Sequence, residues 1–96
     1  MSIEQLAETA LAMVAPGKGI IAIDESNATI KKRFDGVGIE CTEENRRAYR
    51  EMLLTTPNLG QHISGAILYD ETLRQKTKSG VPFRKVMMDN GILPGI

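Results

Sequence analysis

The sequence predicts an α/β fold built on a parallel sheet. The first observation is a repeat. Residues 19–26, Gly-Ile-Ile-Ala-Ile-Asp-Glu-Ser, return 46 positions later at 65–72 as Gly-Ala-Ile-Leu-Tyr-Asp-Glu-Thr. Each copy is an apolar run without polar alternation, which is typical of a strand buried on both faces of a parallel sheet. The second observation is that helical patterns alternate with these strands, as they do in βα units.

The first half of the chain has two helical patterns around the first strand. Residues 2–14 begin with the capping-box pattern Ser-x-x-Gln and continue with apolar residues at helical spacing, which predicts a helix that ends before Pro16. The strand is expected at about 20–23. A second helix is expected to begin at the acidic end of this strand and to be broken by Gly36.

The second half repeats this order. Residues 42–55 begin with a hydroxyl cap and two acids, which suit the positive end of a helix dipole. A second strand is expected at about 63–69, a short helix at about 72–76 and a further helical face from Phe83. Residues 91–96 have the pattern of the start of a third strand.

The predicted sheet is too small to be complete. Ninety-six residues are enough for one small domain. However, three strands with an apolar third strand at the chain end neither cover both faces of a parallel sheet nor protect its edges. We therefore expect residues 1–96 to be a single segment and the first part of a larger fold.

Composition and charge exclude several classes of function. The formal net charge is zero and aromatic residues make up 4% of the chain, which argues against nucleic-acid binding. No apolar stretch approaches the roughly 20 residues of a membrane span. Glu4 and Glu8 lie where a secretory signal would be basic and then apolar, and Cys41 has no partner for an internal disulfide. These features favour a cytoplasmic protein. Cys41 itself is interpreted as a half-buried small apolar residue.

The densest group of polar residues follows the first strand and consists of Asp24, Glu25, Ser26, Thr29 and Arg33. Asp24 stands at the strand end, where α/β folds build active sites, and it is suited to acid/base or charge-stabilising chemistry. Ser26 and Thr29 flank a helix start, which favours an anion, and Arg33 adds a forked cation for a phosphate or carboxylate. The alternative is structural: Ser26 or Asp24 caps the helix, and Arg33 pairs with a surface acid.

The other polar clusters have weaker functional interpretations. Asp70 and Glu71 in the second copy are either site residues or a helix cap. Arg46, its neighbour Arg47 and Arg50 form a basic helical cluster, which is typical of a solvated face paired with nearby acids. The single histidine has no second histidine or cysteine at ligand spacing, so no metal site is expected.

Several strings together resemble one family. The chain closely resembles the amino-terminal part of class I fructose-bisphosphate aldolases from about Leu6 to Ile96. The strings that carry this resemblance are Val-Ala-Pro-Gly-Lys-Gly-Ile at 14–20, Asp-Glu-Ser at 24–26, Thr-Glu-Glu-Asn-Arg-Arg at 42–47, Tyr-Arg at 49–50, Leu-Leu-Thr at 53–55, Glu-Thr-Leu at 71–73 and Gly-Val-Pro-Phe at 80–83.

The resemblance implies a (β/α)₈ barrel, of which this chain would supply the amino-terminal helix and the first two to three βα units. It implies a cytoplasmic lyase of glycolysis and gluconeogenesis that reversibly cleaves fructose 1,6-bisphosphate into glyceraldehyde 3-phosphate and dihydroxyacetone phosphate. A lysine Schiff base performs this chemistry without metal or cofactor. The implied partner is a sugar phosphate, and the family is typically a homotetramer.

The resemblance also assigns roles to residues. Asp24 matches the catalytic aspartate, Ser26 and Thr29 match hydroxyl residues near one phosphate, Arg33 matches a phosphate-binding arginine, and Arg46 matches an arginine assigned to substrate contact. There are two departures. Ala28 replaces a common glycine, and Asp70 replaces a common histidine and is therefore left as a helix cap.

The chain is much shorter than a barrel of about 250 residues. The Schiff-base lysine and the glutamate acid/base of the family lie on later strands, so residues 1–96 alone are expected to be inactive. The alternative function is a small α/β module that binds a sugar phosphate without catalysis.

Overall fold

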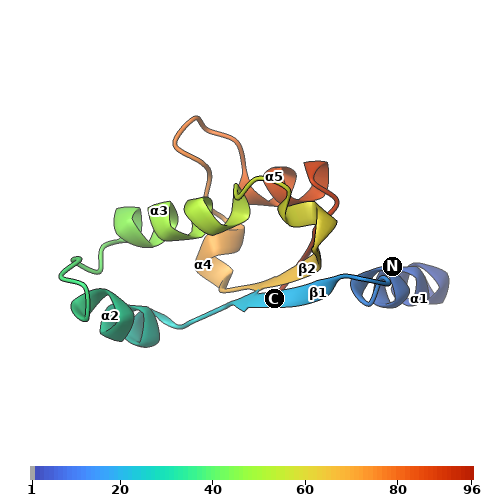
Figure 1. The fold of residues 1–96 in the computed structure, drawn as a ribbon, viewed down its shortest axis with the longest axis horizontal. Helices are drawn as coiled ribbons and strands as arrows, with labels where there is room; N and C mark the ends of the chain where they lie inside the picture. Colours follow the sequence, from blue (N-terminus) through green and yellow to red (C-terminus); the bar gives the residue numbers. More distant parts are fainter. Residues whose placement is uncertain (1) are drawn as a thin grey trace.

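The computed structural model describes residues 2–96 and contains one parallel sheet (Figure 1). Its strands are β1 (Gly19–Ile23), β2 (Ile63–Leu68) and β3 (Leu93–Gly95), and they lie in the order β1-β2-β3. Both neighbouring pairs are parallel, with β2 in the centre. The predicted α/β class with parallel strands is therefore confirmed.

The helices follow the predicted order. They are α1 (Ile3–Met13), α2 (Asn27–Asp35), α3 (Glu43–Leu54), the 3₁₀ turn η1 (Leu59–Gln61), α4 (Asp70–Leu73) and α5 (Phe83–Asp89). Ser2 makes both bonds of the capping box with Gln5, and the Thr42 hydroxyl accepts the Asn45 N–H at 3.1 Å. One boundary is wrong: the short helix expected at 72–76 is α4, which begins at Asp70, directly after the strand.

Helices α3 and α5 lie on one face of the sheet and bury the core there (Figure 1). The amphipathic pattern of each helix provides the apolar side chains that meet the strand residues of that face. The buried apolar cluster consists of Ile23, Leu54, Ala66, Leu68, Phe83, Met87 and Ile92. This packing holds the carboxyl ends of β1 and β2 against α3.

The opposite face of the sheet is largely uncovered by the described residues. Ile20 of β1 keeps 45% of its surface exposed, and α1 has no buried residue. The helices α1 and α2 extend beyond the two ends of the sheet, so the molecule measures 45 × 26 × 26 Å (Figure 1). Helix α1 meets the sheet at Gly65, where a Cβ would lie 2.4 Å from the sulfur of the flexible Met13 side chain.

The strand register differs from the sequence repeat by one residue. The repeat aligns Ile21 with Ile67, but in the sheet Ile21 pairs with Ala66, and an irregularity lies between Gly19 and Ile20. Since side chains alternate between the faces of a strand, a shift of one residue puts repeat-equivalent positions on opposite faces. The two acidic strand ends are therefore not structurally equivalent.

Candidate functional site

The candidate site begins where β1 ends. Residues 24–26 belong to neither strand nor helix, and Asp24 is exposed. Ser26 is the N-cap of α2: its hydroxyl accepts the Thr29 N–H at 3.4 Å and donates to the Thr29 hydroxyl at 3.2 Å. The capping interpretation of Ser26 is thus confirmed, and this cap places two hydroxyl groups beside the positive end of the helix.

Glu25 is the centre of a polar cluster behind Asp24. Its side chain is 12% exposed, and its carboxylate lies 3.6 Å from Arg33 Nε and 3.6 Å from Arg50 Nη2. The Tyr49 hydroxyl donates to Glu25 Oε2 at 3.5 Å. Burial, together with the negative charge of Glu25, raises the pKa of Tyr49 above its ordinary value. Glu25 thus links α2 to α3.

Arg50 is fully buried in the middle of α3. Its Nη2 donates to the backbone oxygen of Glu25 at 2.9 Å and to that of Ile23 at 3.3 Å. The interpretation of the basic cluster as a solvated face is therefore wrong for Arg50, because the helix turns this side chain toward the sheet. The interpretation holds for Arg47, which pairs with Glu44 and Glu51 on the same helix.

Arg46 lies one turn before Arg50 and contacts the first turn of α4, just beyond the end of β2. Its Nη2 and Nε donate to the two carboxylate oxygens of Glu71 at 2.8 and 3.0 Å. This fork-to-fork geometry is the strongest form of arginine–carboxylate pairing. The bond from Arg46 lowers the pKa of Glu71 and is the largest cause of that shift, although partial burial of Glu71 opposes it. Asp70 pairs with Arg74 at 3.1 Å, so it does not act as the expected cap.

Of the five sequence-predicted site residues, the structure joins Ser26 and Thr29 at the start of α2, with Asp24 two residues before Ser26. Arg33 lies in the last turn of α2, where it is 61% exposed and faces Glu25. The fifth predicted residue, Arg46, lies beyond the end of the neighbouring strand, where its guanidinium is paired with the Glu71 carboxylate.

Sequence reasoning placed Glu25 in the polar group after the first strand but missed Tyr49 and Arg50 as its partners. A signal for them exists. The second acid of each repeat copy faces an arginine of α3, and these two arginines are spaced by four residues, or one helical turn.

The described residues show no site for a metal and no membrane span. Residues 2–96 contain no group of three or more His, Cys, Asp or Glu side chains that could hold a metal ion. No helix in the same range is long and apolar enough to cross a membrane.

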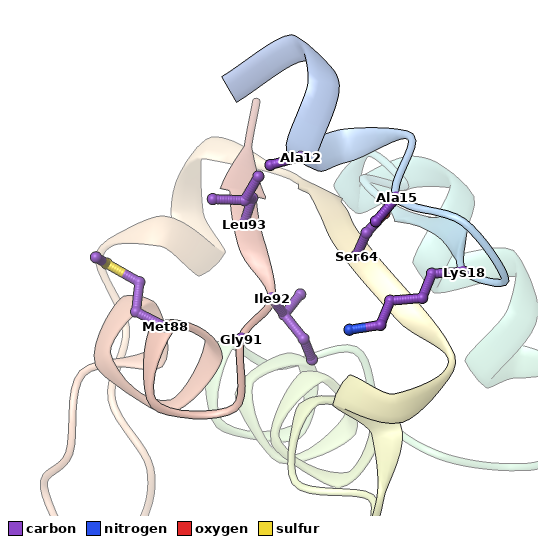
Figure 2. A pocket seen from close by; sticks show the side chains of 8 residues that line it. All are labelled: Ala12, Ala15, Lys18, Ser64, Met88, Gly91, Ile92 and Leu93. Carbon is purple, nitrogen blue, oxygen red and sulfur yellow. The ribbon is translucent and has the colours of Figure 1, made fainter. Parts of the chain in front are cut away.

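A cavity of about 340 Å³ lies at the opposite edge of the sheet, near the amino ends of the strands (Figure 2). The Lys18 side chain extends into it toward Ile92, and Ala12, Ser64 and Leu93 also line it. It is therefore separate from the cluster at Asp24.

The Arg46–Glu71 pair predicts a pH-dependent stability. A carboxylate with a lowered pKa in the folded chain adds stability above the ordinary glutamate pKa of 4.5, and that stability is lost as the pH falls through the lowered value. Between these two values the unfolded chain binds more protons, so the free energy of unfolding rises with pH. We expect Glu71→Gln to remove about 1 kcal/mol or more at pH 7 and to flatten this rise.

Urea unfolding of both chains at several pH values between 3 and 7 measures this effect. In an Arg46→Met background the same Glu71→Gln change should no longer flatten the curve, since the partner of the carboxylate is absent. Equal pH dependence of the unmodified chain and Glu71→Gln would contradict the prediction.

The fold and the site define a class of protein: a parallel α/β protein with an exposed carboxylate and two hydroxyl groups where a strand meets a helix. The family model of class I fructose-bisphosphate aldolases matches residues 5–96. The chain belongs to the class I fructose-bisphosphate aldolase family.

Individual relatives agree with this assignment. A probable fructose-bisphosphate aldolase class 1 of Xanthomonas campestris pv. campestris is 80% identical over all 96 residues. The chloroplastic fructose-bisphosphate aldolase 1 of Chlamydomonas reinhardtii is 59% identical over 93 residues, which is 97% of this chain and 25% of that protein. The chain spans 29% of the length of the Xanthomonas relative.

A solved structure shows the same fold. The aldolase of Plasmodium falciparum, crystallised with TRAP and a small-molecule inhibitor, superposes with a TM-score of 0.93 at 54% identity. The superposition covers 97% of this chain and 27% of that one.

Proposed function

We propose that residues 1–96 form the amino-terminal part of a class I aldolase that reversibly cleaves fructose 1,6-bisphosphate into glyceraldehyde 3-phosphate and dihydroxyacetone phosphate. The observation that carries this proposal is the position of Asp24. Within a chain of this family, Asp24 is an exposed carboxylate at the carboxyl end of β1, directly before the hydroxyl-lined start of α2. Enzymes with parallel strands build their active sites at such ends.

The residues divide into two roles. Asp24 orients the substrate and the Schiff-base lysine, which the remainder of the protein supplies. Ser26, Thr29 and Arg33 bind one phosphate, since the N-cap hydroxyls, the amide groups of the first turn and an exposed guanidinium all favour an anion. Arg46 contacts substrate only if its guanidinium breaks one of its two hydrogen bonds to the Glu71 carboxylate.

The same proposal covers the architecture and the setting. Helix α1 and the βα units of β1 to β3 would form one segment of a (β/α)₈ barrel, and the uncovered sheet face would be its interior. The active protein would be a cytoplasmic homotetramer in glycolysis and gluconeogenesis. It would need no cofactor and no metal, because the Schiff-base iminium itself accepts the electrons of the cleaved carbon–carbon bond.

The test compares two chains. The first is residues 1–96 alone. The second, here called the fused chain, is residues 1–96 followed by the part of the Xanthomonas relative beyond its matching segment. We expect the fused chain to cleave fructose 1,6-bisphosphate and to form a borohydride-trapped adduct with dihydroxyacetone phosphate outside residues 1–96. Residues 1–96 alone should do neither.

Two results would contradict the proposal. The first is a trapped adduct on a lysine within residues 1–96. The second is an inactive fused chain when the intact Xanthomonas relative, assayed in parallel, is active.

A further inference from the structure

We propose that Arg50 is a positioning residue for Asp24: its buried guanidinium holds the backbone on both sides of Asp24 and thereby sets the direction of the Asp24 carboxylate. This inference rests on the proposed function, because it assigns Asp24 to the chemistry. Arg50 itself faces the backbone and is fully buried, so it does not contact substrate.

Arg50 contacts the backbone on both sides of Asp24. A single nitrogen, Arg50 Nη2, carries two N–H groups, and it donates to the backbone oxygens of Ile23 and Glu25 at 3.3 and 2.9 Å. The first oxygen belongs to the peptide plane before Asp24, and the second belongs to the plane after Glu25. Asp24 and Glu25 lie outside both strand and helix, whereas Ser26 is held by α2, whose Ile30 N–H donates to the Ser26 backbone oxygen at 2.9 Å. Arg50 therefore supplies a restraint that secondary structure does not.

The charge of Arg50 is offset in part by Glu25, while its Nε and Nη1 have no hydrogen-bond partner among the described residues. An unpaired guanidinium would be costly at this depth, and the Glu25 carboxylate 3.6 Å away offsets its charge. The same carboxylate lies 3.6 Å from Arg33 Nε. The residue that restrains the backbone at Asp24 and the arginine proposed to bind phosphate thus share one carboxylate, which couples the two halves of the site.

The helix that carries Arg50 is itself held in place by three contacts. Thr42 caps α3, Arg46 of α3 pairs with Glu71, and Leu54 is buried in the core. A guanidinium on such a helix restrains its partners, whereas one on a mobile segment would follow them. A lysine is a poor replacement, since its ammonium has no planar fork and is more strongly hydrated.

The test is a double-mutant cycle in the fused chain. Arg50→Lys should lower kcat by about 10- to 100-fold, the loss expected when a catalytic group is misplaced by about 1 Å. KM should change by less than about threefold, because the phosphate-binding side chains remain. In the Asp24→Asn background, Arg50→Lys should have almost no further effect on kcat, since the group that it positions is already lost.

Arg47→Lys is the matched control. Arg47 lies on the same helix and pairs only with Glu44, Glu51 and the Lys76 backbone, so kcat should stay within about twofold. The proposal is overturned if Arg50→Lys behaves like Arg47→Lys, or if its effect on kcat is undiminished in the Asp24→Asn background. An inactive unmodified fused chain overturns the proposed function, and this inference falls with it.

If Arg50→Lys does not fold, Arg50→Ala provides a second test of the proposal. Truncation leaves a cavity lined by the two carbonyl oxygens, and added guanidinium ions at millimolar concentration should fill it and restore kcat. Arg47→Ala should show no such gain. Failure of guanidinium to restore kcat to folded Arg50→Ala would overturn the proposal.

Discussion

Asp24→Asn in the fused chain should lower kcat for fructose 1,6-bisphosphate cleavage by about 100- to 10,000-fold, the range for loss of a positioned acid or base. The amide has the same shape but carries no charge, so it neither exchanges a proton nor stabilises positive charge on the Schiff-base lysine. KM should change little, because Ser26, Thr29 and Arg33 are untouched. Steady-state kinetics with a coupled dehydrogenase assay measures both constants.

Asp35→Asn is the control for this change. Asp35 lies at the end of α2, is exposed and pairs with Lys31 at 2.8 Å, far along the helix from its capped start. Its loss should alter kcat by less than about twofold, because exposed pairs of this kind contribute little. If Asp24→Asn retained more than half of the unmodified kcat, Asp24 would have no direct part in the reaction.

Phe83→Ala should destabilise the chain by about 3–5 kcal/mol. Phe83 is fully buried at the start of α5, within the single apolar cluster that joins α3 and α5 to the sheet. Truncation removes the transfer free energy of the ring and leaves a cavity that a rigid helix start cannot fill. Native domains have only about 5–15 kcal/mol of stability, so this loss is a large fraction of it.

Urea unfolding followed by circular dichroism measures this loss, and Met88→Ala on the same helix is the control. Met88 is 60% exposed, so its truncation should cost less than about 1 kcal/mol. Equal midpoints for Phe83→Ala and Met88→Ala would show that the α5–sheet contact does not hold the fold together.

Local patterns predicted the elements well because their causes are local. Ser2 and Thr42 cap helices through hydroxyl bonds that span three residues, and both caps are present. The apolar runs at the first two strands predicted a parallel sheet, which is present, although one face of β1 is largely uncovered by the described residues. The start of α4 was missed because Asp70 follows β2 after only one residue, with no separate cap to mark it.

The candidate site was predictable in part for the same reason. Asp24, Ser26 and Thr29 lie within six consecutive residues around a helix start, which brings the two hydroxyl groups together wherever it forms, and Arg33 follows later on the same helix. Arg50 was misjudged because its partners, the backbone oxygens of Ile23 and Glu25, are 27 and 25 residues away. No periodicity within α3 distinguishes an arginine that faces water from one that faces a strand end.

The sequence by itself therefore determined the α/β class, the capped helices, the family and the place where chemistry is expected. Only the tertiary structure decided how the two acidic strand ends differ. The irregularity at Gly19 offsets the strand register by one residue from the repeat, and α3 lies so that Arg50 holds the backbone at Asp24 while Arg46 holds the side chain of Glu71. The physical reason is that register and helix placement depend on packing between distant segments, which the composition of each segment alone does not encode.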